Sequence, residues 1–153
     1  RSTQAKTLFP YTTLFRSRGN NKIIVEIEGH EVNDFQSLND LLSDKLNFPN
    51  YFGENLDALF DMLVDLQWLK QDSIEFVISD FENLLIDEGE LAKAELMLLL
   101  EDVCLEWKEG DFNDDEWEMK KFRVIILGDN SLEQEIDNSI ELLLKNFEEF
   151  ESE

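Results

Sequence analysis

Three short β-rich segments, separated by patterns typical of helices, constrain the fold of this chain most strongly. Residues 22–28 (KIIVEIE), 73–79 (SIEFVIS) and 122–127 (FRVIIL) combine branched and aromatic side chains with partial alternation, which is typical of strands. The intervening segments carry apolar residues at helical spacing. Strands that alternate with helices favour a parallel sheet with right-handed crossovers. The sequence therefore predicts an α/β fold with a small three-stranded parallel sheet packed with helices.

Four helices are expected around this sheet. Asp34 is placed to cap the first helix, and Pro49 ends that region because proline disfavours helical backbone in the residue before it. The second and central helices are expected over about residues 55–69 and 88–108. Residues 131–134 (SLEQ) match a capping box and predict an extra C-terminal helix. The apolar stripe of that last helix comprises Ile136, Ile140, Leu143 and Phe147.

The first part of the chain differs from the rest. Residues 7–17 (TLFPYTTLFRS) contain Thr-Leu-Phe twice, and the string resembles the in-frame translation of an adapter oligonucleotide. We interpret residues 1–21 as a non-native or disordered segment and assign no functional residue to it. Residues 22–153 are expected to form one domain that ends with the helical extension.

The composition indicates an acidic cytoplasmic protein. The formal net charge of −23 at pH 7 repels phosphate backbones, which argues against nucleic acids and anionic membranes as partners. A basic protein would be attracted, although solubility alone also explains an acidic surface. The single cysteine, Cys104, has apolar neighbours and predicts a buried thiol in a reducing compartment. No apolar run approaches the roughly 20 residues of a membrane span, and no signal peptide is recognisable.

Most catalytic and cofactor signatures are absent from the sequence. Gly53 stands alone, so no glycine-rich phosphate loop is present. The single histidine, His30, follows Gly29 in a predicted turn, where an exposed histidine is the ordinary outcome. Asp111, Asn113 and Asp115 begin a calcium-loop pattern, but Glu116 and Phe122 occupy the positions that require glycine and glutamate. We therefore predict no catalytic residues, no metal site and no cofactor.

The segment NYFGENLDALFDML (residues 50–63) places carboxylates and aromatic rings at the start of a helix. On a helical wheel, Asp57, Asp61 and Asp65 fall within about 80° of one another. This acidic ladder lies opposite the leucine stripe, with Phe60 at the border. An ordinary solvated face is one interpretation. The other is a protein interface, in which rings supply buried area and short carboxylates imitate phosphate oxygens.

Residues 48–63 (FPNYFGENLDALFDML) resemble the signature of the barstar-like family, small intracellular inhibitors of secreted barnase-type ribonucleases. The predicted order of strands and helices agrees with the α/β fold of that family. The resemblance implies that Asp61 enters the phosphate site of the nuclease and that a glutamate near residues 101–106, for which we favour Glu106, joins the interface. The implied partner-binding residues are Tyr51, Phe52, Gly53, Asn55, Asp57, Phe60, Asp61 and Glu106.

The chain also departs from the family pattern. Phe52 and Phe60 replace a tyrosine and a tryptophan common there, which keeps the apolar area but removes a hydroxyl and an indole N–H. The acidic loop at residues 110–118 and the C-terminal helix look like additions that recognise a different toxin or cover the edge strand.

Together these observations predict a monomeric, non-enzymatic inhibitor or immunity protein (an antitoxin). It would bind a basic barnase-type ribonuclease or related toxin 1:1 and occlude its active site. One alternative is an acidic protein-binding module for a basic partner that is not a nuclease. A second is a metal-dependent enzyme that uses the acidic clusters, which would require saturable binding of Mg²⁺ or Mn²⁺.

Overall fold

The computed structural model describes residues 4–8, 21–49, 55–109, 118–128 and 131–151 of the chain. Strands β2 (Lys22–Glu28), β3 (Ser73–Ser79) and β4 (Lys121–Gly128) are parallel neighbours, which confirms the predicted three-stranded parallel sheet. Strand β1 (Gln4–Leu8) pairs antiparallel with β4 and gives the order β1-β4-β3-β2. The sequence predicted no strand in residues 1–21. Because pairing does not test whether that segment is native, its interpretation stays a prediction.

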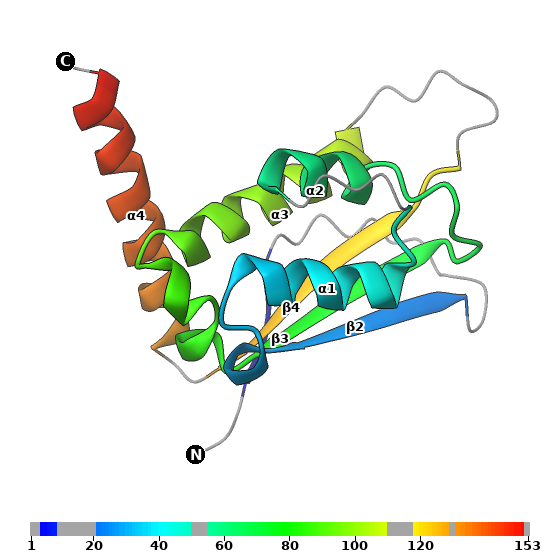
Figure 1. Cartoon of the computed structure of the whole chain (residues 1–153), viewed down its shortest axis with the longest axis horizontal. Coiled ribbons are helices and arrows are strands. Elements are labelled where there is room, and N and C mark those ends of the chain that lie inside the picture. The colour runs from blue at the N-terminus through cyan, green and yellow to red at the C-terminus, as the bar shows by residue number, and fades with distance from the viewer. Residues whose placement is uncertain (1–3, 9–20, 50–54, 110–117, 129–130, 152–153) are drawn as a thin grey trace.

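The core lies between the sheet and the helices α1 (Phe35–Leu46), α2 (Leu56–Leu63) and α3 (Ala92–Glu109), which lie along one side of the sheet (Figure 1). Alternate residues of the three parallel strands face these helices and are buried. The rings of Phe76 and Phe122 meet edge to face, with centroids 4.9 Å apart. On the other face of the sheet, the carboxylate of Glu75 is 2.7 Å from Lys22 Nζ and 3.8 Å from Arg123 Nη1.

A side-chain cap sets the beginning of α1, and a glycine turn precedes α3. The Asp34 carboxylate accepts a 2.8 Å hydrogen bond from the backbone N–H of Ser37, and the Ser37 hydroxyl faces the backbone N–H of Asp34 at 3.3 Å. This capping box confirms the predicted start of α1. Helix α3 begins at Ala92 instead of Glu88, because residues 86–88 form a 3₁₀ turn and Gly89 then adopts φ +93°.

Two indole N–H groups tie the helices together. Trp107 Nε1 on α3 donates a 2.8 Å hydrogen bond to the carbonyl oxygen of Leu63, the last residue of α2. Trp68 Nε1 donates a 2.8 Å bond to the carbonyl oxygen of Leu46, the last residue of α1. Carbonyls at the end of a helix lack partners within the helix, so both bonds satisfy groups that burial would otherwise leave unpaired. The position of α2 therefore depends on α3.

The predicted C-terminal helix is present as α4 (Leu132–Glu151), which projects at one end of the molecule (Figure 1). Leu132, Ile136 and Leu143 are buried, and Lys93 Nζ on α3 pairs with Glu135 Oε1 at 3.5 Å. Phe147, about one turn before the end of the helix, leaves 55% of its surface exposed. None of the helices in the described part of the chain is both long and apolar enough to cross a bilayer.

Cys104 should react with thiol reagents only after unfolding. The side chain is buried and lies 3.7 Å from the carbonyl oxygen of Phe122, and burial, with a smaller contribution from the charge of Glu101, raises the pKa of the thiol from 9.0 to about 12. Because the thiolate is the nucleophile, we expect no alkylation by iodoacetamide at pH 8 in the native state and complete alkylation in denaturant, measured by mass spectrometry. Equal rates in the two conditions would contradict this burial.

The same pKa difference has a consequence for stability. The unfolded thiol releases its proton above pH 9, whereas the folded thiol holds it to about pH 12. The contribution of the protonated, buried thiol to the free energy of unfolding is therefore fully present below pH 9 and is lost as the pH rises from 9 to 12. Across that window, the free energy of unfolding of the native sequence should fall more steeply than that of Cys104→Ala, measured by urea denaturation. Parallel profiles would refute the assignment.

Candidate partner-binding surface

Helix α2 presents the two carboxylates that the sequence singled out. Asp57 and Asp61 are one helical turn apart and both are exposed, while Phe60 is partly buried and packs against the core. The side-chain oxygen of Asn55 caps the helix by accepting a 2.7 Å hydrogen bond from the N–H of Ala58. This cap uses the side-chain oxygen of Asn55 and not its amide nitrogen. The predicted partner-binding residues Tyr51, Phe52 and Gly53 lie outside the described residues.

The predicted acidic ladder is shorter than expected. Helix α2 ends at Leu63 instead of Leu69, so Asp65 lies beyond the helix, where its carboxylate accepts a 3.3 Å bond from the N–H of Gln67. The chain turns at Leu66, which adopts φ +53° and is completely buried. Burial of the Leu66 side chain in the core contributes more to the stability of the fold than another turn of helix would. The prediction that Asp65 continues the ladder was therefore wrong.

A groove of about 790 Å³ runs between α2, α3 and α4 and includes both carboxylates of α2. Its acidic lining is Asp57 and Asp61 from α2 with Glu95 and Asp102 from α3. Its apolar lining is Leu56, Phe60, Leu98, Leu99, Leu143 and Phe147. Among the residues that the structure describes, no lysine, arginine or histidine lines the groove, and no basic side chain forms an ion pair with any of the four carboxylates. The groove therefore attracts cationic groups.

Glu106 is exposed on α3 but is not part of the groove lining. It lies one turn beyond Asp102 on the same face of the helix, because residues four apart are neighbours on a helix surface. Asp102 falls within the residues 101–106 that the family resemblance indicated, whereas Glu95 was not anticipated. The i, i+3, i+7 spacing of Glu95, Leu98 and Asp102 is the sequence signal that could have found this stripe.

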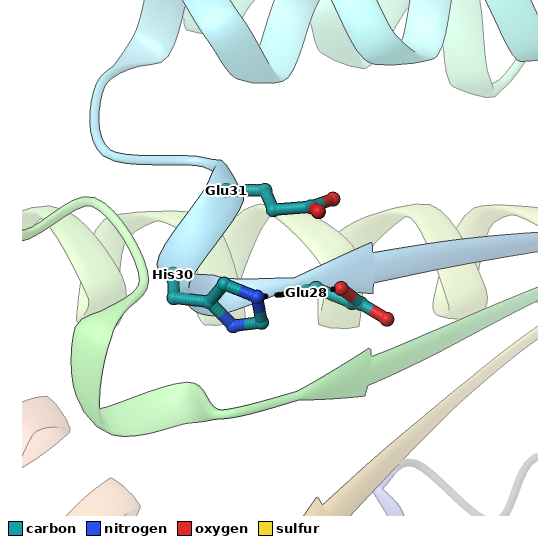
Figure 2. Close-up of side chains that lie close together, drawn as sticks. All are labelled: Glu28, His30 and Glu31. Carbon is teal, nitrogen blue, oxygen red and sulfur yellow. Dashed lines mark ion pairs between the residues drawn. The ribbon is translucent and has the colours of Figure 1, made fainter.

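The surroundings of His30 form a separate surface cluster (Figure 2). His30 Nε2 is 3.5 Å from Glu28 Oε2, and His30 Nδ1 is 3.2 Å from Asp80 Oδ2. Ligand atoms of Glu28, His30 and Glu31 lie within 4.8 Å of one another. All three side chains are largely exposed, as is common on an acidic surface, so we assign no metal site to them. The calcium-like pattern at Asp111, Asn113 and Asp115 lies outside the described residues.

The groove has the chemistry of a recognition surface. It combines carboxylates with leucine and phenylalanine side chains. The described residues that line it include no histidine, cysteine or hydroxyl group that could act as a nucleophile or a general base beside the carboxylates. Carboxylates that face solvent next to apolar area suit a protein partner whose arginines or lysines pair with them.

Comparison with known proteins agrees with this description. The profile of the family described as Barstar (barnase inhibitor) matches residues 23–127, from β2 to β4. A protein of Bacillus subtilis (strain 168) named "Putative ribonuclease inhibitor YrdF" is 42% identical over 59 residues, which are 37% of this chain and 58% of that protein. The match thus spans less than two thirds of that relative. The family profile covers more than half of the chain, from the first parallel strand to the last, and the chain therefore belongs to the barstar family.

Proposed function

We propose that this protein is an intracellular inhibitor that binds a basic barnase-type ribonuclease, or a related toxin, and occludes its active site. The observation that carries the proposal is the pair Asp57 and Asp61, exposed and without a basic partner in the described residues, in an acidic groove. The family and the ribonuclease-inhibitor relative support the same role. The protein would perform no catalysis and would bind 1:1 as a monomer.

The inhibitory mechanism follows from charge and shape. A ribonuclease holds the phosphate of its substrate with cationic side chains, and a carboxylate offers oxygens of similar geometry to those donors. Asp61 would occupy the phosphate site and Asp57 would pair with a neighbouring cation. The amide of Asn55 would donate a hydrogen bond, and Phe60 would supply apolar contact. Because buried charges lose hydration, the pairs stabilise the complex only when both partners are hydrogen-bonded.

An inhibition assay tests this function. RNA cleavage by a barnase-type ribonuclease is titrated with the full chain, and an unrelated protein of similar net charge is the control. We expect cleavage to stop near one equivalent, and the association rate to fall with ionic strength because the attraction is electrostatic. Tight binding without inhibition would replace this function with the alternative, an acidic module for a non-nuclease basic partner. Absence of binding to a panel of such ribonucleases would refute it.

A further inference from the structure

We propose that the groove between α2, α3 and α4 receives a basic amphipathic segment of the partner protein, beyond the groups that Asp57 and Asp61 contact. This inference rests on the proposed function, because it enlarges the same surface. It assigns a role to α4, which follows the residues 23–127 that the family profile matches. The segment would carry lysine or arginine side chains next to one or two apolar side chains.

The apolar side of the groove is formed partly by α4. Leu143 and Phe147 are one turn apart, and both line the groove together with Leu56 and Phe60 of α2. Leu143 is buried, whereas Phe147 is 55% exposed although it continues the same apolar stripe. An aromatic ring that lines a groove and is only half covered gains stability when a partner covers the rest.

The acidic side of the groove decides which kind of partner fits. Asp57 and Asp61 lie on one wall, and Glu95 and Asp102 on another, so a segment in the groove meets carboxylates from two helices. A nucleic acid or an anionic membrane would be repelled. A second copy of this chain would bring its own net charge of −23 to the contact, which opposes self-association through this face. A basic segment with apolar residues complements both properties of the groove.

The groove also connects the acidic surface of α2 with the apolar surface of α4. Asp57 and Asp61, which the proposed function places against the nuclease, line the same groove as Phe147. A partner docked on α2 is therefore next to α4, and contacts with α4 would distinguish partners that share the phosphate-binding chemistry. Helix α4 would thus contribute to specificity.

A binding experiment with a synthetic peptide tests the inference independently of any ribonuclease. The probe is a fluorescently labelled peptide of about 15 residues with lysine and leucine at amphipathic helical spacing. The full chain should bind it saturably at 1:1. Phe147→Ala should weaken binding about tenfold, since part of a phenylalanine's contact area is lost. The matched control is Leu144→Ala, a half-exposed residue of α4 that does not line the groove.

A second pair of variants, which have the same net charge as each other, tests the charges of the groove. Glu95→Gln combined with Asp102→Asn removes two charges from the groove, and Asp137→Asn combined with Glu141→Gln removes two exposed charges from α4 outside it. We expect weaker peptide binding and a smaller salt dependence for the first pair only. All four variants alter partly or fully exposed positions, and circular dichroism checks that they fold.

The outcomes separate this inference from the proposed function. Weaker peptide binding by Phe147→Ala and by the Glu95→Gln, Asp102→Asn double variant, with both control variants unchanged, supports the inference about the groove. Equal weakening in groove and control variants would show non-specific attraction and overturn it, as would the absence of saturable binding. Either negative result leaves ribonuclease inhibition to be judged by its own assay.

Discussion

Asp61→Ala is expected to weaken the affinity for a barnase-type ribonuclease by about 150- to 4,000-fold, because removing one member of a desolvated charge pair costs roughly 3–5 kcal/mol. The carboxylate of Asp61 is exposed in the free protein, so the free energy of unfolding should change little. Isothermal titration calorimetry would measure the affinity, and the cleavage assay would measure the accompanying loss of inhibition.

The matched control is Asp44→Ala, which removes an exposed aspartate of α1 that does not line the groove. It makes the same change in net charge, so a weakening shared by both variants would reflect long-range attraction alone. If Asp61→Ala binds as tightly as the native protein, Asp61 is not the residue that enters the phosphate site, although the fold is unaffected.

Gly29→Ala is expected to destabilise the protein by about 3 kcal/mol or more, since a new atom is forced into packed backbone. Gly29 is buried at the end of β2, and a methyl group there would overlap the carbonyl oxygen of Asp80. It would also lie 2.8 Å from the Asp80 carbonyl carbon and 3.0 Å from the backbone nitrogen of Leu84. These are backbone atoms, which cannot move aside as a flexible side chain can.

The neighbouring substitution His30→Ala provides the control. His30 is exposed, and its pairs with Glu28 and Asp80 lie at the surface, so its removal should change the free energy of unfolding by less than about 1 kcal/mol. Urea denaturation of both variants gives the comparison. Equal stability of Gly29→Ala and the native protein would mean that the segment from β2 to α1 does not pack against the segment after β3 as described.

The strands and helix starts were predictable because their signals are local. The predicted bounds of β2 and β3 match the structure, since alternation of branched apolar residues marks strands that bury one face. The start of α1 followed from Asp34, whose side chain caps a backbone N–H only three residues away. Asp57 and Asp61 were found together because one turn of a helix separates them.

The ends of helices depended on contacts that local patterns do not contain. Helix α2 stops at Leu63 because the chain turns to bury Leu66, and its last carbonyl accepts a hydrogen bond from Trp107, 44 residues away. A helical wheel uses only the spacing of residues in the sequence and contains neither contact, so the prediction from it extended the acidic ladder to Asp65.

The sequence by itself determined the order of strands and helices, the acidic pair on α2 and the family, because each depends on residues close together in the chain. Only the tertiary structure decided which side chains share the groove. Glu95, Asp102 and Phe147 are far from Asp61 in sequence, and they line the same groove because α3 packs between α2 and α4. Packing of whole helices sets such distances, and it depends on the complete set of buried contacts rather than on any one segment.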